Sequence, residues 1–100
     1  MFSSDRFIKK TSIRLFNLGD VMINAYILIN MQPGNVDKAI KEMRKIENLA
    51  KISVVAGEYD IVVRAQVKNL EDLLGTTDKI QTIEGVMKTT TQIIEKEIAL

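Results

Sequence analysis

Apolar and polar residues alternate along residues 22–31, MINAYILINM. One face of this segment carries Ile23, Ala25, Ile27, Ile29 and Met31, and the other carries Asn24, Tyr26, Leu28 and Asn30. A period of two predicts a β-strand, and the first set predicts that one of its faces is fully apolar.

Two later segments carry apolar residues at helical spacing, each directly after an asparagine that can cap a helix. The segment after Asn35 has the stripe Val36, Ala39, Ile40, Met43 and Ile46. In the segment after Asn69, Asp72 stands three residues beyond the cap, a variant of the capping box. Its predicted apolar stripe is Leu70, Leu73, Leu74, Thr77 and Ile80.

The remaining β-rich segments predict three further strands, over 51–56, 60–67 and 86–95. The short link 57–59 makes the first two an antiparallel hairpin. The order β-α-β-β-α-β predicts an α+β fold, a ferredoxin-like βαββαβ sandwich of the dimeric α/β barrel type, in residues 21–100. Its four-stranded antiparallel sheet would carry both helices on one face.

The sheet face without helices would expose a partly apolar surface. Its predicted members are Tyr26, Leu28, Val55 and Val62, among the polar Asn24, Asn30 and Arg64. Such a face usually finds a partner, and packing on its own copy gives a two-fold homodimer.

Composition narrows the classes of function. One hundred residues suffice for a single core, and the net charge of +1, with acids and bases interspersed, disfavours direct nucleic-acid binding. Cysteine and histidine are absent, which excludes disulfides, Cys/His zinc sites and histidine-based catalysis. No apolar run is long enough to span a membrane. We therefore expect a cytoplasmic protein with no cofactor, no metal and no catalytic residues.

Chain direction brings three segments, 31–34, 57–60 and 84–88, to the same end of the predicted sheet. A free amino acid needs an acceptor for its ammonium group and donors for its carboxylate. Asp60 or Glu58 could accept, loop amides and threonine hydroxyls (Thr89, Thr90, Thr91) could donate, and Tyr59 could cover the side chain or pack at a subunit contact. From the residues alone, turn geometry is the more common reason for a glycine and an aspartate such as Gly57 and Asp60 in a hairpin link, and threonine is common in strands for packing reasons.

Three stretches carry a resemblance to a known family: AYILINMQPGNVDKAIKEM, VVAGEYDIVVRAQVKNLEDL with its Gly-x-Tyr-Asp turn, and IQTIEGVMKTTTQII. In this order, the chain resembles the effector-binding (RAM) domain of the Lrp/AsnC transcription regulators. The resemblance implies a sheet-mediated dimer, an octamer-like ring of dimers, and an amino-acid effector bound between dimers. It further implies an effector loop of Gly57, Glu58, Tyr59 and Asp60, faced by Thr89, Thr90 and Thr91.

The sequence departs from full-length regulators in residues 1–20, which are too few for a helix-turn-helix domain. We expect a stand-alone RAM protein whose first 20 residues are an extra strand, an assembly contact or a disordered arm. It would bind an amino acid and act by assembling with itself or with full-length Lrp/AsnC regulators. Two alternatives stay open: a small dimeric enzyme of the monooxygenase or isomerase type, using Tyr26 and Arg64, and a purely structural oligomerisation subunit.

Overall fold

The computed structural model describes residues 22–100, so the predictions for residues 1–20 lie outside the described residues. The elements are β2 (Ile23–Met31), α1 (Val36–Met43), β3 (Leu49–Val54), β4 (Ile61–Val67), α2 (Leu70–Gln81) and β5 (Val86–Ile93). The order β-α-β-β-α-β and the α+β ferredoxin-like class are therefore confirmed.

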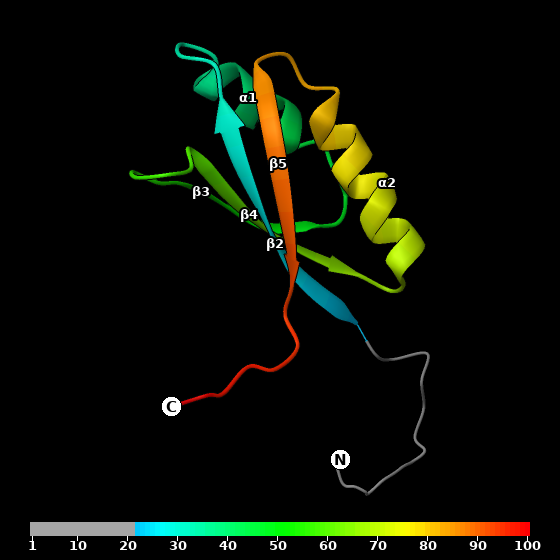
Figure 1. Cartoon of the computed structure of the whole chain (residues 1–100). Helices are drawn as coiled ribbons and strands as arrows, with labels where there is room; N and C mark the ends of the chain where they lie inside the picture. The colour runs from blue at the N-terminus through cyan, green and yellow to red at the C-terminus, as the bar shows by residue number, and fades with distance from the viewer. Residues whose placement is uncertain (1–21) are drawn as a thin grey trace, which may run out of the picture.

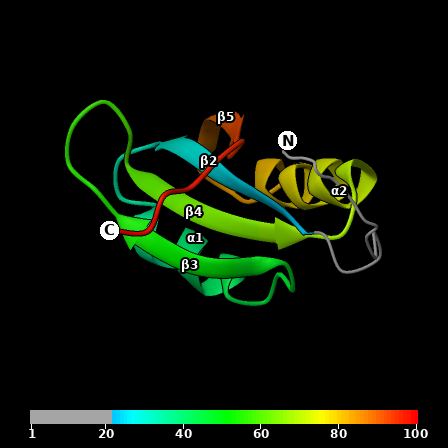
Figure 2. The ribbon, with the colours of Figure 1, turned by 90° about the horizontal axis from the view of Figure 1, so that it is seen from below.

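The four strands form one antiparallel sheet in the order β3-β4-β2-β5. Both helices lie against the same face of this sheet, α1 behind β3 and β4 and α2 beside β5 (Figures 1 and 2). We call the opposite surface the open face. The two central strands, β4 and β2, bury alternate residues against the helices, as the period of two predicts: Ala25, Ile27, Ile29, Met31, Ile61, Val63, Ala65 and Val67.

Strand β3 lies two residues earlier in the chain than predicted, at Leu49–Val54 instead of 51–56. A bulge interrupts its pairing with β4 between Leu49 and Lys51. The hairpin link is accordingly longer than the three residues expected, although Val55 N still donates to Asp60 O at 3.0 Å. Strand β5 ends at Ile93, two residues before the predicted end.

The second helix begins as predicted but buries a different stripe. Asn69 caps it, since its side chain accepts from Asp72 N at 2.8 Å. Leu73 and Ile80 are buried as expected, whereas Leu70 and Leu74 are 52% and 59% exposed. The prediction for those two leucines was wrong.

The buried position that sequence reasoning missed on α2 is Thr76. Its hydroxyl donates to Asp72 O at 2.9 Å and accepts from Asn48 Nδ2 at 3.2 Å. Both bonds satisfy the hydroxyl inside the core, so burying it carries little cost.

The first helix also departs from the prediction at both ends. Asn35 occupies the N-cap position, yet its side chain makes no capping hydrogen bond. The helix ends at Met43, so Ile46 lies beyond it and packs against the core from the following turn.

On β2 and β4, the open face carries the residues that the sequence assigned to it. Strand pairing aligns Val62, Leu28 and Thr90 in one row across it and Arg64, Tyr26 and Gln92 in the next. Leu28 and Val62 are half-buried and Tyr26 is exposed. Val55, expected within β3, lies just beyond the end of that strand and is half-buried.

Candidate functional site

The three segments predicted to meet at one end of the sheet do meet there. The backbone N–H of Gln32, just after β2, donates to Gly85 O at 2.8 Å. The β3–β4 link joins the same place, since Asp60 N donates to Ile29 O at 2.9 Å. Chain direction in an antiparallel sheet was thus a sufficient guide to this convergence.

The Asp60 carboxylate is part of the architecture of this edge. Its Oδ2 accepts the backbone N–H of Met31 at 2.7 Å. The pairing of β2 with β4 ends at Ile29 and Ile61, and the carboxylate supplies the acceptor for the Met31 N–H beyond that last pair. One Asp60 oxygen therefore holds the sheet, and the other is free of that bond and can accept from a ligand.

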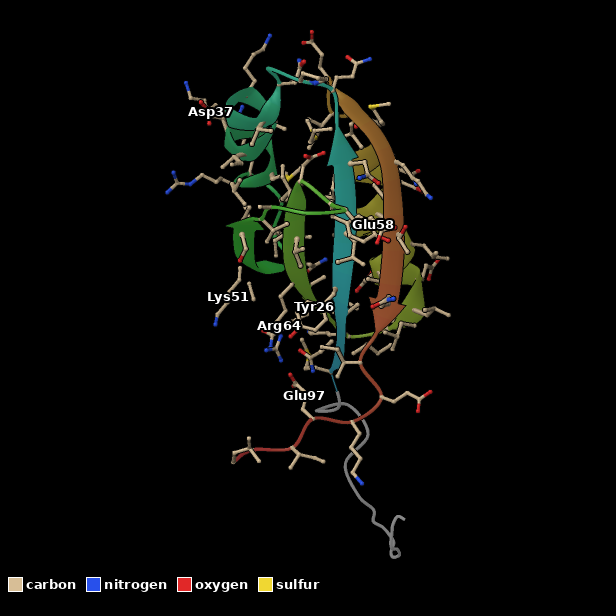
Figure 3. The ribbon with its side chains drawn as sticks, turned by 60° about the vertical axis from the view of Figure 1, so that its left-hand side comes forward. Tyr26, Asp37, Lys51, Glu58, Arg64 and Glu97 are labelled. Carbon is tan, nitrogen blue, oxygen red and sulfur yellow. The ribbon has the colours of Figure 1, made fainter. Side chains whose placement is uncertain are left out.

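The β3–β4 link, residues 55–60, crosses β2 towards β5 on the open side of the sheet. Asn30, on the open face of β2, donates from Nδ2 to the backbone carbonyl of Glu58 at 2.8 Å. Figure 3 shows Glu58 beside β2 and β5, far from the β3 edge where the link begins. The Glu58 carboxylate is exposed, while Tyr59 and Asp60 are half-buried.

Two glycines at this edge are required for different reasons. Gly57 has φ of +127°, a backbone conformation open to glycine, with free space where a Cβ would stand. Gly85 has φ of +92°, and a Cβ there would lie 2.4 Å from Asn35 Cβ. Gly57 therefore shapes the link, and Gly85 permits the close approach of the β5 start to the α1 N-terminus.

The three threonines do not face one pocket. Thr90 pairs with Leu28 and lies on the open face, whereas Thr89 and Thr91 pair with Ile29 and Ile27 and point to the helix side. Thr89 Oγ1 also accepts from Gln81 Nε2 of α2 at 2.9 Å. Of the three, only Thr90 shares a sheet face with the link.

Sequence reasoning missed two residues at this edge, Asn30 and Lys88. They are cross-strand partners on the open face, so Lys88 lies in the same row as Asn30, whose side chain binds the Glu58 carbonyl. The alternation of β2 had already assigned Asn30 to the open face. Finding Lys88 required the register of β5.

Two hollows of about 400 Å³ lie on the helix side of the fold. One runs between α1 and β3 and is mainly apolar, with Ile40, Ile46 and Ile52 in its wall, and the other lies between α1 and the turn after α2. Neither is lined by a residue of the 57–60 segment. Across residues 22–100 we find no group of three or more acidic side chains placed to hold a metal ion, and no helix of the length and apolarity that crossing a membrane requires.

Family membership follows from comparison with known proteins. The model of the Lrp/AsnC ligand binding domain matches residues 24–99, which include every element described above except the first residue of β2, and the whole candidate edge. The chain belongs to the Lrp/AsnC ligand-binding domain family. The resemblance drawn from the three sequence stretches is confirmed.

Relatives in this family include the HTH-type transcriptional regulator FL11 of Pyrococcus furiosus, which is 34% identical over 74 residues. That match covers 74% of this chain and 49% of FL11, so the chain spans about half the length of this relative. The Lrp/AsnC family is one of transcription regulators rather than enzymes.

Solved structures show the same fold. The protein TTHA0845 of Thermus thermophilus is 26% identical, with a TM-score of 0.72, and the match covers 78% of this chain and 99% of that one. A feast or famine regulatory protein of M. tuberculosis, solved in complex with L-methionine, is 25% identical with a TM-score of 0.69. That match covers 93% of this chain and 64% of the tuberculosis protein.

Proposed function

We propose that this Lrp/AsnC-type domain binds a free amino acid at the edge formed by residues 57–60 and the open-face ends of β2 and β5. The observation that carries the proposal is the pair of bonds that fixes the link there, Met31 N to Asp60 Oδ2 at 2.7 Å and Asn30 Nδ2 to Glu58 O at 2.8 Å. Held in this way, the link needs little ordering when a ligand arrives, which favours affinity.

The groups at this edge suit a zwitterion. The Glu58 carboxylate and the second oxygen of Asp60 can accept from an ammonium group. The Lys88 ammonium, the Thr90 hydroxyl and the amides of the link can donate to a carboxylate. The related tuberculosis regulator, solved with L-methionine, supports an amino acid as the ligand class.

Assembly is the second part of the proposal. The open face of one copy packs on that of another to give a two-fold dimer, and dimers join into rings with the effector edge between them. The chain then acts on transcription through these assemblies, formed with itself or with full-length relatives of the FL11 type, and residues 22–100 do not themselves contact DNA.

The proposal is tested by thermal unfolding with each of the twenty amino acids at millimolar concentration. A ligand at about 100 times its dissociation constant adds roughly 2.7 kcal/mol, which raises the midpoint by several degrees or more. We expect a shift for one chemical group of amino acids. Asp60→Asn is the informative variant, because an asparagine oxygen can still accept from Met31 N while the negative charge is lost.

Controls separate the site from general charge effects. Glu58→Gln tests the second acceptor, and the matched control is Asp78→Asn, which removes one carboxylate charge from the exposed side of α2. The ligand shift should shrink in Asp60→Asn or Glu58→Gln and persist in Asp78→Asn. Absence of a shift with every amino acid, or an unchanged shift in the Asp60→Asn, Glu58→Gln double variant, contradicts binding at this edge.

A further inference from the structure

The charged residues at the strand positions of the open face are all basic, and Glu58 of the 55–60 link is the acidic residue beside them at the effector edge. The strand positions that the register assigns to this face include three basic residues, Lys51, Arg64 and Lys88. The other open-face positions of the four strands are apolar or neutral: Asn24, Tyr26, Leu28, Asn30, Ser53, Val62, Gln66, Thr90 and Gln92. Packing two such faces together about a two-fold axis would bring like charges into one poorly solvated layer, which opposes association.

The segment after β5, residues 94–100, supplies a counter-charge. Ile94 N donates to Asn24 O at 2.8 Å and so continues the edge of the sheet by one bond. Three residues later, Glu97 Oε1 lies 3.0 Å from Arg64 Nη2. Figure 3 shows these two side chains pointing towards one another, with Tyr26 beside them, and Figure 2 shows the segment passing in front of β2 and β4.

The region where this segment meets the sheet is incomplete within one protomer. Among residues 22–100, the buried Asn24 Oδ1 and Arg64 Nε have no hydrogen-bond partner. Next to Glu97 in the chain, the Ile98 side chain is 73% exposed. An unpaired buried polar group and an exposed large aliphatic group on the same surface both indicate a contact with another molecule.

We propose that residues 94–100 are part of the two-fold interface between copies of this chain. Glu97 neutralises Arg64 so that the basic open face can be covered by its own copy, and Ile98 packs on the second protomer. This inference rests on the sheet-to-sheet dimer proposed above and adds a residue pair that controls its stability.

The test measures the dimer dissociation constant by sedimentation equilibrium at fixed ionic strength. Glu97→Lys places a fourth cation on the face and should raise that constant about tenfold or more. The matched control is Asp78→Lys, the same charge change on the exposed side of α2, which lies on the other face of the sheet; it should alter the constant less than about threefold. The exchanged pair Arg64→Glu with Glu97→Lys should restore most of the affinity.

Several outcomes overturn the inference. Equal weakening by Asp78→Lys and Glu97→Lys would reduce the inference to a net-charge effect, and failure of the exchanged pair to recover affinity would remove the Arg64–Glu97 contact from the interface. The Leu28→Asp variant tests the sheet-to-sheet dimer independently of the role proposed for residues 94–100. If Leu28→Asp dissociates the dimer and Glu97→Lys leaves it unaffected, the sheet-to-sheet assembly stands and the role of residues 94–100 is rejected. If neither variant affects the dimer, or if the wild type is a monomer, both proposals are rejected.

Discussion

Replacing Asp60 with alanine should destabilise the fold even without ligand, because the carboxylate accepts the backbone N–H of Met31 at 2.7 Å. Losing a hydrogen bond to a charged group, and leaving its donor without an acceptor, costs about 1–3 kcal/mol. Asp60 is half-buried, so water can reach part of the site, and we expect a loss of about 2 kcal/mol. For a domain of this size each kcal/mol lowers the unfolding midpoint by roughly 4–8 °C.

Asparagine at the same position keeps a hydrogen-bond acceptor but removes the negative charge. The Asp60→Asn variant keeps an oxygen in place for Met31 N and should lose less than about 1 kcal/mol, since only the charge assistance disappears. Urea unfolding at one fixed protomer concentration, followed by circular dichroism, measures both variants on the same scale. Glu58→Ala, on an exposed side chain of the same link, should stay within about 0.5 kcal/mol of the wild type.

Two results would refute this reasoning. If Asp60→Ala were no less stable than Glu58→Ala, the bond to Met31 N would contribute nothing measurable. If Asp60→Asn were as unstable as Asp60→Ala, the negative charge, and not the position of the acceptor, would stabilise the edge. Either result would also change the choice of variant in the ligand experiment, where a loss of fold must not be mistaken for a loss of binding.

Two further predictions use the same assay on other parts of the fold. Gly34 and Gly85 both have positive φ, but only at Gly85 would a Cβ clash, with Asn35, so Gly85→Ala should be less stable than Gly34→Ala by at least about 1 kcal/mol. Adding Asn35→Gly should recover that difference, and equal stabilities would show that the turn relaxes freely. Leu73, 2% exposed, should cost about 2–5 kcal/mol on truncation to alanine, whereas exposed Leu74 should cost less than about 1 kcal/mol; similar losses at both would contradict the observed orientation of α2.

Strand β2 could be predicted in full because its pattern allows one register alone. A slip by one residue would bury Asn24 and Asn30 and expose Ile27 and Ile29, at a large cost in free energy. Strand β3 lacks this constraint, since it lies at the sheet edge and a bulge between Leu49 and Lys51 breaks its alternation. Its position depended on pairing with β4, which the local sequence does not encode.

The error on α2 has a specific geometric cause. Leu73, Thr76 and Ile80 are spaced three and four residues apart and share one side of the helix, whereas Leu74 is rotated by about 100° from Leu73. Hydrophobicity alone selects Leu74 over Thr76. In the structure Thr76 is buried in place of Leu74, because two hydrogen bonds satisfy the Thr76 hydroxyl. One of them is with Asn48, 28 residues away in the sequence.

The candidate site, like the fold, was predictable from the sequence only in part. Chain direction predicts that residues 31–34, 57–60 and 84–88 converge, and they do. The bond between Asp60 and Met31 N depends on where the pairing of β2 with β4 ends, and the placement of Thr90, and not of Thr89 and Thr91, on the open face depends on the register of β5. Both are consequences of strand pairing that only the folded sheet defines.

The proposed effector edge and the proposed dimer face share one surface of one strand. Asn30, which holds the link through Glu58 O, and Leu28, which lies in the middle of the open face, are successive open-face residues of β2. A ligand at the edge and a second copy on the face therefore contact the same rigid strand within two residues. If the ligand binds the dimer more tightly than the monomer, it strengthens dimerisation by the same factor, because the two equilibria are linked. Under the proposed function, this arrangement would couple the concentration of an amino acid directly to the state of assembly.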